Sequence, residues 1–520
     1  MNDVAALLQR LHALEGQVTR LESQNGTLRT DNSLLSSDNK RLASDNKRLV
    51  GDLHHLTADN KRLTADLQRL QRKVDDLLAR LGLTSANSSK PPSTDPDKSV
   101  SKKGRILDPD APKKPIGAQD GHTGHARRWF PSDEVTRFEN VRPASCDHCH
   151  ADLSQQPPAQ PPAKRQVVEI PVLRPDVIEY HLHTLACPHC AKLTTALPPS
   201  EATTGTGPRA TALMATLCGR YRLSREETAH LMETVLGIPM SKGSVQNACE
   251  EVSEALRTPV GELVEALPKQ ATVHLDETGW RQGKERRWLW VAVTGLFTVF
   301  AVHAKRGEPQ LRAWYPKGYS GVVHSDRWGT YGKVFKGVRR QVCWAHLLRD
   351  MQGIIDRGAE GKAATVAAKE GMGRIFKIWH GYKNGKKSRG EVVEETAEDR
   401  KKWMEWGKAG REQREDTKWK AMGKWLVGGE GSVFRFIEEE GVEPTNNAAE
   451  QAVRAGVMWR RGSQGTRSAE GSVFVERLLS VGATCRQQGR EVWTYLYDTL
   501  CAWRRGTPPP SLLPVTGGGR

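Results

Sequence analysis

Long hydrophobic runs are missing from this sequence. No apolar stretch among its 520 residues approaches the roughly 20 residues that span a bilayer, and the N-terminus lacks the apolar core of a secretory signal. Cysteine is also scarce: of nine residues, four form two Cys-x-x-Cys pairs and five are scattered. That distribution argues against a disulfide framework and suits a reducing compartment. We therefore expect a cytoplasmic protein without membrane contact.

Acidic residues are too few to balance the basic ones. Lys and Arg total 78 against 61 Asp and Glu, which gives a net charge of +17 and a pI of about 9.5. An excess of this size predicts a polyanionic partner, most simply DNA. Aromatic residues make up only 6% of the chain, yet 15 of them are Trp. The length allows three or four domains.

Leucine occupies every seventh position from Leu7 to Leu77, and the position three residues earlier is apolar or asparagine. Leucine at d with several asparagines at a favours a parallel two-stranded coiled coil in register. At about 1.5 Å per residue the rod is over 100 Å long. We therefore predict that residues 1–82 form a leucine zipper and make the protein a homodimer or a higher oligomer. The asparagines at a are Asn25, Asn32, Asn39, Asn46 and Asn60.

A polar segment separates the zipper from the next predicted domain. Residues 83–120 are rich in Ser, Pro, Lys and Asp and have no apolar period, so we predict a disordered linker. The tail at 506–520 is also predicted to be disordered.

Two Cys-x-x-Cys pairs, 37 residues apart, mark residues 121–203 as a zinc-binding domain. Such paired turns in a cytosolic chain indicate a structural Zn²⁺ site with four thiolates. Histidines at 148, 150 and 189 are alternative ligands, and a redox dithiol is the weaker interpretation. The segments 166–173 and 177–185 are predicted as strands of a zinc ribbon. The four predicted ligands are Cys146, Cys149, Cys187 and Cys190.

Residues 204–268 are predicted to be helical. Periodic helices at 209–221 and 224–236 are followed by a break, and Ser241 then caps a third helix. This order resembles a helix-turn-helix, although most helix pairs of this shape are simply packed helices. If the domain reads DNA, the groove-facing residues would be Lys242, Ser244, Gln246 and Asn247.

Residues 269–350 are predicted to hold the first part of a catalytic domain. The predicted strands follow the order of a ribonuclease-H-like fold: three in an antiparallel meander, a short helix at 309–315, then two more. In that fold the first and fourth strands lie side by side. The sequence therefore predicts a multidomain α/β protein. The five strands are predicted at 272–276, 287–293, 297–303, 321–325 and 341–344, with turn residues at 277–279 and a helix from about 345.

Three carboxylates fall at informative places in this pattern. Asp276 ends the first strand and Asp326 follows the fourth, so the fold would bring them together. Like charges that close stay ionised only with a cation between them. Oxygen ligands without a nearby thiol favour Mg²⁺ or Mn²⁺, and two such ions about 4 Å apart support in-line phosphoryl transfer. Glu450, on a late helix with Asn447 and Arg454, is the third candidate.

Alone, each acid has a plainer interpretation as a turn or cap residue, with Asn447 as the N-cap before Glu450. Glu277 would point to the opposite face of the strand.

A long, charged and Trp-rich segment separates Asp326 from Glu450. We interpret residues 351–440 as a helical insertion and residues 441–505 as the last part of the catalytic domain, whose two final helices would cover the sheet. His346 either approaches the active site or is a satisfied core histidine. In 457–472, arginines among Gly and Ser predict a loop that contacts the DNA backbone. Predicted DNA-contacting arginines in this region are Arg454, Arg460, Arg461 and Arg467.

The segments LDETGWR, HSDRWGTY, CWAHLLRD and EPTNNAAEQAVR resemble the blocks of the insertion sequence 66 family of bacterial transposases. That family carries a DDE (Asp, Asp, Glu) active site, and the resemblance places the triad on Asp276, Asp326 and Glu450. The segment 117–128 resembles the stretch that precedes the zinc domain in members of that family. Gln451 stands where the family pattern leads us to expect arginine. The resemblance also implies companion small proteins.

These observations predict a DNA transposase that frees a 3′-OH at each element end and joins it to target DNA, in a nucleoid-associated setting. Two alternatives stay open. A metal-dependent nuclease without strand transfer would carry the same triad. A non-enzymatic DNA-binding regulator would use the zipper, the zinc module and the helix-turn-helix alone.

Overall fold

The computed structural model describes residues 2–80, 129–202, 204–316, 318–356, 361–413, 417–428 and 433–514. The chain divides into two compact units, Met1–Thr84 and Ser85–Arg520. Among the described helices, none combines the length and the apolar character that crossing a bilayer requires. The linker predicted at 83–120 lies outside the described residues, as does the segment 117–128.

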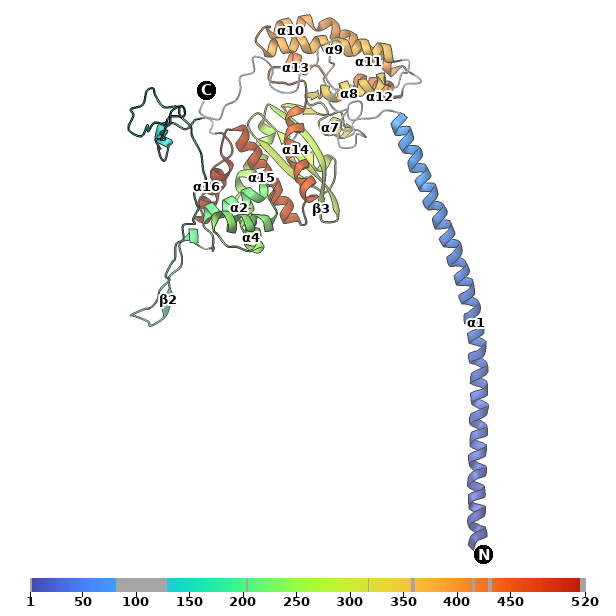
Figure 1. The fold of residues 1–520 in the computed structure, drawn as a ribbon. Helices are drawn as coiled ribbons and strands as arrows, with labels where there is room; N and C mark the ends of the chain where they lie inside the picture. The colour runs from blue at the N-terminus through green and yellow to red at the C-terminus, as the bar shows by residue number, and fades with distance from the viewer. Residues whose placement is uncertain are drawn as a thin grey trace. The chain divides into compact units, whose positions relative to one another are not determined.

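In its described residues the first unit is the helix α1, Asn2–Arg80 (Figure 1). The leucines at seven-residue spacing from Leu7 to Leu63 are 54–67% exposed on it. A continuous apolar stripe of this length stabilises a helix in water only when a partner covers it. The predicted helix is thus confirmed, and its pairing with a second copy stays a prediction.

The second unit contains a group of helices, in which the predicted break after residue 236 and the predicted cap at Ser241 are confirmed. Ser224 and Glu227 form a capping box at the start of α3, and Gly237, with φ 66°, ends that helix in the left-handed conformation that glycine accepts. Ser241 caps α4 by accepting the backbone N–H of Ser244 at 3.1 Å. The helices are α2 (Pro208–Gly219), α3 (Arg225–Leu236), α4 (Lys242–Ala255) and α5 (Arg257–Ala266).

The described part of the second unit also holds a five-stranded sheet of order β5-β4-β3-β6-β7. The predicted adjacency of the first and fourth strands is confirmed, because β3 and β6 pair in parallel. The turn predicted at 277–279 is wrong: pairing with β4 holds β3 extended from His274 to Gln282. The strands are β3 (Thr272–Gln282), β4 (Glu285–Val293), β5 (Thr298–His303), β6 (Val322–Ser325) and β7 (Arg340–Val342).

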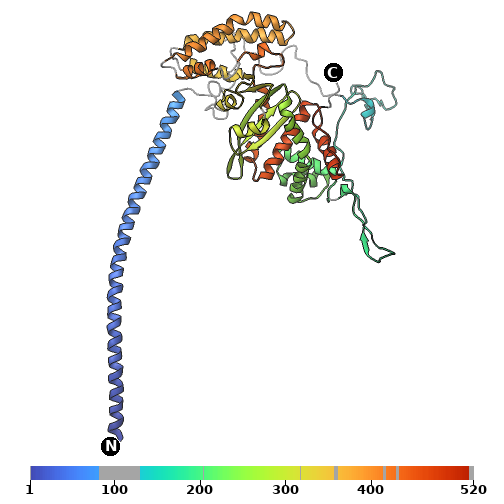
Figure 2. The same ribbon diagram turned by 180° about the vertical axis from the view of Figure 1, so that it is seen from behind.

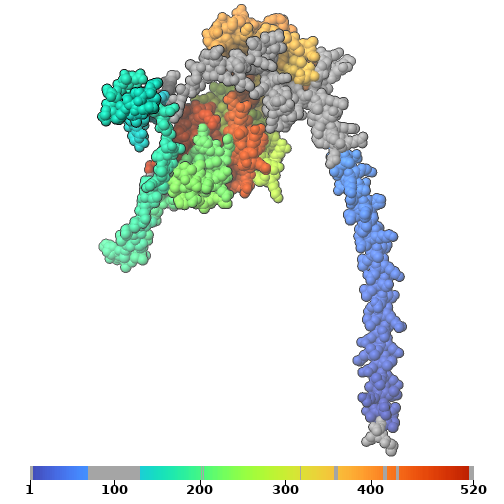
Figure 3. Space-filling view, in the orientation of Figure 1, coloured from blue at the N-terminus to red at the C-terminus, as the bar shows by residue number. Residues whose placement is uncertain are grey.

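Helices cover both faces of this sheet. On one face α14 (Asn447–Ser463) packs against β3 and β4, and it lies at the molecular surface in Figure 3. A Cβ at Gly456 would lie 2.1 Å from Leu289 Cδ2, so the close approach of α14 to β4 requires glycine there. The opposite face carries Trp290, which packs on Tyr331 of α7 (Gly329–Val334) with ring centroids 6.5 Å apart. The short helix α6 (Glu308–Trp314) confirms the one predicted between the strands.

The edge strand β5 is closed by side chains of α15 (Ala469–Gln487) instead of another strand. Acceptors four residues apart on the helix meet N–H groups two residues apart on the strand, because both spacings are about 6 Å. This arrangement satisfies the edge and blocks pairing with another chain. The bonds run from Thr298 N to Thr484 Oγ1 (3.1 Å), Phe300 N to Ser480 Oγ (2.8 Å) and Val302 N to Glu476 Oε1 (2.7 Å).

Glu476, the acceptor for the Val302 N–H, makes the stability of the fold depend on pH. Burial raises the pKa of Glu476 to about 7, against 4.5 unperturbed, so the fold favours the protonated carboxyl. The stability contributed by the neutral Glu476 carboxyl is fully present below about pH 4.5 and is lost as the pH rises through 7. The free energy of unfolding falls by about 3 kcal/mol by pH 8. Glu476→Gln keeps an acceptor for Val302 and should remove this dependence. Urea unfolding at pH 5 and pH 8 measures it; equal pH dependence in both proteins would refute the assignment.

The described residues between β7 and α14 are mostly helical, as predicted, and form a group of helices in Figures 1 and 2. Their buried side chains form a core of their own. Five tryptophans are buried in this core, and they pack with Val322 and Val342 at one end of the sheet. The buried tryptophans are Trp344, Trp379, Trp403, Trp406 and Trp419. The helices are α8 (Trp344–Ile355), α9 (Lys362–Lys383), α10 (Arg389–Glu395), α11 (Ala397–Arg411), α12 (Thr417–Val427) and α13 (Arg435–Glu438).

The zinc-ribbon strands predicted at 166–173 and 177–185 are wrong. The described strands nearby are β1 (Thr184–Ala186) and β2 (Leu193–Thr195), which pair in antiparallel register. The rest of the two predicted segments joins no ladder, and an alternating pattern forms a strand only where a neighbour satisfies its backbone groups.

Two predictions for the C-terminal end are also wrong. The predicted disorder of 506–520 fails for the described residues up to 514, because Leu512 is fully buried and its carbonyl accepts a 2.7 Å bond from Gln488 Nε2. The carbonyls of Pro510 and Ser511 also accept hydrogen bonds, from Tyr495 at 2.8 Å and Arg490 at 3.0 Å, so several contacts hold the described tail in place. The final helix, α16 (Val492–Arg504), packs on α2 and α4 instead of the sheet, with Arg504 bonded to Glu251 at 2.7 Å.

Candidate active site

The parallel pairing of β3 and β6 sets the positions of two predicted site residues. His274 lies opposite His324 in this register. Asp276 and Asp326 each follow their histidine by two residues, so they lie at the same level just beyond the last paired residues. Each carboxylate accepts one nearby backbone N–H at 2.9 Å, from Glu277 to Asp276 Oδ1 and from Trp328 to Asp326 Oδ1. The fold therefore presents two aspartates at neighbouring strands, as predicted.

Glu450 reaches the same region from the first turn of α14. Its backbone N–H donates to the carbonyl of Asn446 at 3.1 Å. The prediction of Asn447 as N-cap is wrong, because Asn446 occupies that position and makes no side-chain cap bond. The Asn446 amide instead donates to the Leu275 carbonyl at 2.7 Å and lies 3.2 Å from His274 Nδ1. Asn446 thus ties the start of the Glu450 helix to the Asp276 strand.

The electrostatics of Asp276 link the three acids. Burial raises its pKa well above the ordinary value, and the charges of Glu277, Asp326 and Glu450 raise it further. Carboxylates that disfavour one another's ionisation in this way are stabilised by a cation. The donor set is carboxylate oxygen, which fits a hard divalent ion such as Mg²⁺ or Mn²⁺.

Glu277 lies on the opposite face of β3, as the strand alternation predicts. Tyr331 donates a hydrogen bond to its Oε2, and Arg306 forms an ion pair with Oε1 at 2.6 Å. The Arg306 guanidinium also lies over the rings of Trp328 and Trp288, 4.2 and 5.0 Å from their centroids. Burial raises the pKa of Glu277, and the charge of Asp326 adds to the effect. Glu277 is therefore paired with the Arg306 side chain and lies beside the three candidate site acids.

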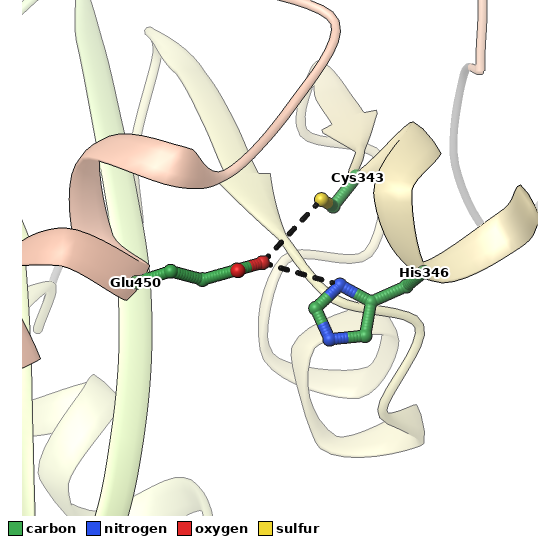
Figure 4. Close-up of side chains that lie close together, drawn as sticks. All are labelled: Cys343, His346 and Glu450. Carbon is green, nitrogen blue, oxygen red and sulfur yellow. Dashed lines mark hydrogen bonds and ion pairs between the residues drawn. The ribbon is translucent and has the colours of Figure 1, made fainter. Parts of the chain in front are cut away.

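Two further side chains contact Glu450 (Figure 4). Its Oε1 lies 3.4 Å from His346 Nδ1 and 3.7 Å from Cys343 Sγ. His346 thus approaches the acidic cluster, which was one of its two predicted placements. Within the described residues, these three groups have ligand atoms within 4.8 Å of one another, whereas Asp276 and Asp326 belong to no such group. The expectation that no thiol lies near the acids is therefore wrong for Glu450. Cys343 and Asn446 were not predicted, since only the fold brings them to Glu450.

The two Cys-x-x-Cys turns are built alike. In each turn the backbone N–H of the first cysteine donates to the carbonyl five residues later, that of Ala151 or Lys192. The carbonyl of the same cysteine accepts a bond from the N–H four residues later, that of His150 or Ala191, and all four bonds are 2.8–2.9 Å long. The returning residues, His150 and Ala191, have φ of 58° and 56°. The first thiols, Cys146 and Cys187, have lowered pKa values because turn N–H groups favour the thiolate: those of Cys149 and His148 in the first turn, and those of His189 and Cys190 in the second.

Each turn therefore presents a thiolate-favouring pair. The four thiols are not among the described groups of three ligand atoms within 4.8 Å. A single zinc site that joins all four thiolates stays a prediction. The geometry of each turn fits one pair of its ligands.

The predicted groove-facing residues of α4 have mixed surroundings. Lys242 Nζ lies 3.7 Å from Glu226. Gln246 accepts a bond from Arg225 at 2.9 Å and donates one to Glu250 at 2.8 Å, so its amide is engaged within the domain. Asn247 is exposed. Their role in DNA reading stays a prediction.

The DNA-contact loop predicted at 457–472 is wrong at both ends, because 457–463 belong to α14 and 469–472 belong to α15. Helix α14 continues to Ser463, and Gln464, with φ 61°, ends it. Arg460 donates to the Gly279 carbonyl and to Thr278 Oγ1, so it anchors α14 to β3. The other three predicted arginines are exposed: Arg454, Arg461 and Arg467.

A family model described as "Transposase IS66 family" matches residues 206–473, more than half of the chain. The match includes Asp276, Asp326 and Glu450. A family of unknown function (DUF6444) matches residues 34–128, which cover part of α1 and the segment after it. No curated protein matches the chain.

Proposed function

The chain belongs to the IS66 family of transposases, and we propose that it cleaves DNA at transposon ends and joins the freed 3′-OH to target DNA. Asp276, Asp326 and Glu450 would be its catalytic DDE residues, in a ribonuclease-H-like domain. The sheet order and the parallel pairing of β3 with β6 support that fold.

One observation carries the proposal. Asp276 is a buried carboxyl whose pKa is raised first by burial and then by acids that include Asp326 and Glu450, which come from β6 and α14. Gathering acids from separate elements destabilises the fold unless a cation compensates. Such a cluster, in a family of transposases, is explained by divalent-metal chemistry on DNA.

The residues would divide the work as follows. Asp276 and Asp326, fixed by their strands and by backbone N–H bonds, would hold a shared Mg²⁺ or Mn²⁺, and Glu450 would complete a second site. When bound, such ions activate the attacking oxygen and stabilise the leaving one in an in-line displacement. Asn446 would position Glu450. Hydrolysis and strand transfer would use the same site, with no covalent enzyme intermediate.

The remaining parts would serve assembly on DNA. We propose that α1 pairs two copies so that two ends are cut together. Zn²⁺ at Cys146, Cys149, Cys187 and Cys190 would fix a small basic module on the DNA. Exposed Arg454, Arg461 and Arg467 would contact phosphates. Companion small proteins and a nucleoid setting belong to the same proposal.

The test is strand transfer in Mg²⁺ with DNA that carries the element's own ends. Products in which end 3′-OH groups are joined to target DNA support the proposal. Cleavage without joined product would replace it with the nuclease alternative. Specific end binding without any reaction, also when companion proteins are supplied, would favour the regulator.

A further inference from the structure

The segment Cys343-Trp-Ala-His346 begins helix α8 and brings its first and last side chains to Glu450. Cys343 is the N-cap of α8, and its Sγ accepts the backbone N–H of Asn446 at 3.2 Å. The N–H groups two and three residues after it, those of Ala345 and His346, also lie against the sulfur. The N–H groups two and three residues after Cys146 and Cys187 do the same. Burial raises the pKa of Cys343 to about 11, and the backbone N–H groups of Asn446, His346 and Ala345 offset only part of that rise. A cation bound at the sulfur would therefore be what stabilises its thiolate.

The other two groups complete a ligand set. His346 Nδ1 is buried, makes no hydrogen bond and lies 3.4 Å from Glu450 Oε1. Cys343 Sγ lies 3.7 Å from the same oxygen. Sulfur, nitrogen and oxygen thus converge within 4.8 Å on one side of Glu450, as Figure 4 shows. The nearest partner of His346 Nδ1 is thus the Glu450 carboxylate, which a cation between them would also contact.

We propose that Cys343, His346 and Glu450 bind a borderline-soft divalent cation such as Zn²⁺, and that this withdraws Glu450 from Asp276 and Asp326. The proposal rests on the proposed function only in taking Glu450 as the third catalytic carboxylate. Three protein ligands with an open fourth position are common for Zn²⁺.

The donor types decide which ion enters. Thiolate and imidazole select Zn²⁺ or Co²⁺, whereas Mg²⁺ requires oxygen ligands. The two environments therefore share one carboxylate and differ in the metal they accept. Occupancy by Zn²⁺ at Cys343 and His346 lowers the availability of Glu450 for the oxygen site, so Zn²⁺ acts as an inhibitor that competes for this side chain.

The experiment is Co²⁺ binding to the full-length protein, followed by thiolate–Co²⁺ absorption and by metal content after dialysis. Wild type is expected to bind about one equivalent more than Cys343→Ser and His346→Gln. Cys485→Ser is the matched control, because Cys485 is also fully buried but lies on α15, away from the acids. Cys187→Ser identifies the metal held by the cysteine turns, so that it is counted separately.

Equal Co²⁺ content in wild type, Cys343→Ser and His346→Gln overturns the proposal. His346 is 26% exposed, so His346→Gln keeps the test valid if Cys343→Ser does not fold. Asp326→Asn separates this inference from the proposed function. Asp326 is outside the ligand group, so this variant is expected to keep the Co²⁺ content whether or not it cleaves DNA.

Discussion

Asp326→Asn is expected to lower end cleavage and strand transfer by about a thousandfold or more while end binding persists. The amide has the size of the carboxylate and can still accept the 2.9 Å bond from the Trp328 N–H, so local structure is kept. What is lost is a negative charge that would hold the metal. Metal stabilisation of the transition state is worth several kcal/mol, and about 4 kcal/mol corresponds to about a thousandfold. Single-turnover cleavage with parallel end-binding measurements checks this.

Asp350→Asn is the matched control. Asp350 pairs with Arg327 at 2.9 Å and is 21% exposed, so it is a nearby aspartate with a partner of its own. Its loss should cost at most about 1 kcal/mol of stability and leave cleavage within a few-fold. If Asp326→Asn cleaves like Asp350→Asn, the second catalytic acid is misassigned.

Leu35→Asp is expected to weaken self-association of the full-length protein by more than about a thousandfold. Leu35 stands at a d position, where each chain would bury a leucine worth about 2–3 kcal/mol. Both copies change at once, so about 5 kcal/mol is lost from the dimer, before any repulsion between the aspartates. Sedimentation equilibrium measures this, and paired-end complexes on gels should disappear in step.

Leu34→Asp is an unusually close control for this experiment. Leu34 and Leu35 are 61% and 60% exposed on the same helix, and they differ only in heptad position. Association that falls equally in both variants would mean that helix solubility or stability, and not a d-position seam, decides the result. Association that falls in neither would remove α1 as the dimerisation element.

Sequence patterns predicted the secondary elements that depend on local signals. The Ser241 cap, the break after residue 236 and the alternation at 272–276 are local signals, and they place the end of α3, the start of α4 and the start of β3 correctly. Glu277 was rightly separated from Asp276, because residues that alternate along a strand face opposite sides.

Predictions failed where long-range contacts decide the structure. The ladder with β4 overrides turn residues at 277–279, and the burial of Leu512 orders a tail that its composition predicts to be disordered. Asn446 and Cys343 come to Glu450 through tertiary contacts alone, so no period or spacing marks them. Whether the four predicted zinc thiols come together also depends on contacts between residues far apart in the sequence.

The central claim is that Asp326 binds a catalytic metal together with Asp276 and Glu450. Asp326→Cys tests it most directly, because a thiolate binds Mg²⁺ poorly but accepts Mn²⁺ more readily. The variant is predicted to be inactive in end cleavage with Mg²⁺ and to regain cleavage with Mn²⁺, at unchanged DNA binding. Cleavage that is equal in the two metals, or that Mg²⁺ supports at the wild-type rate, would contradict metal ligation by Asp326.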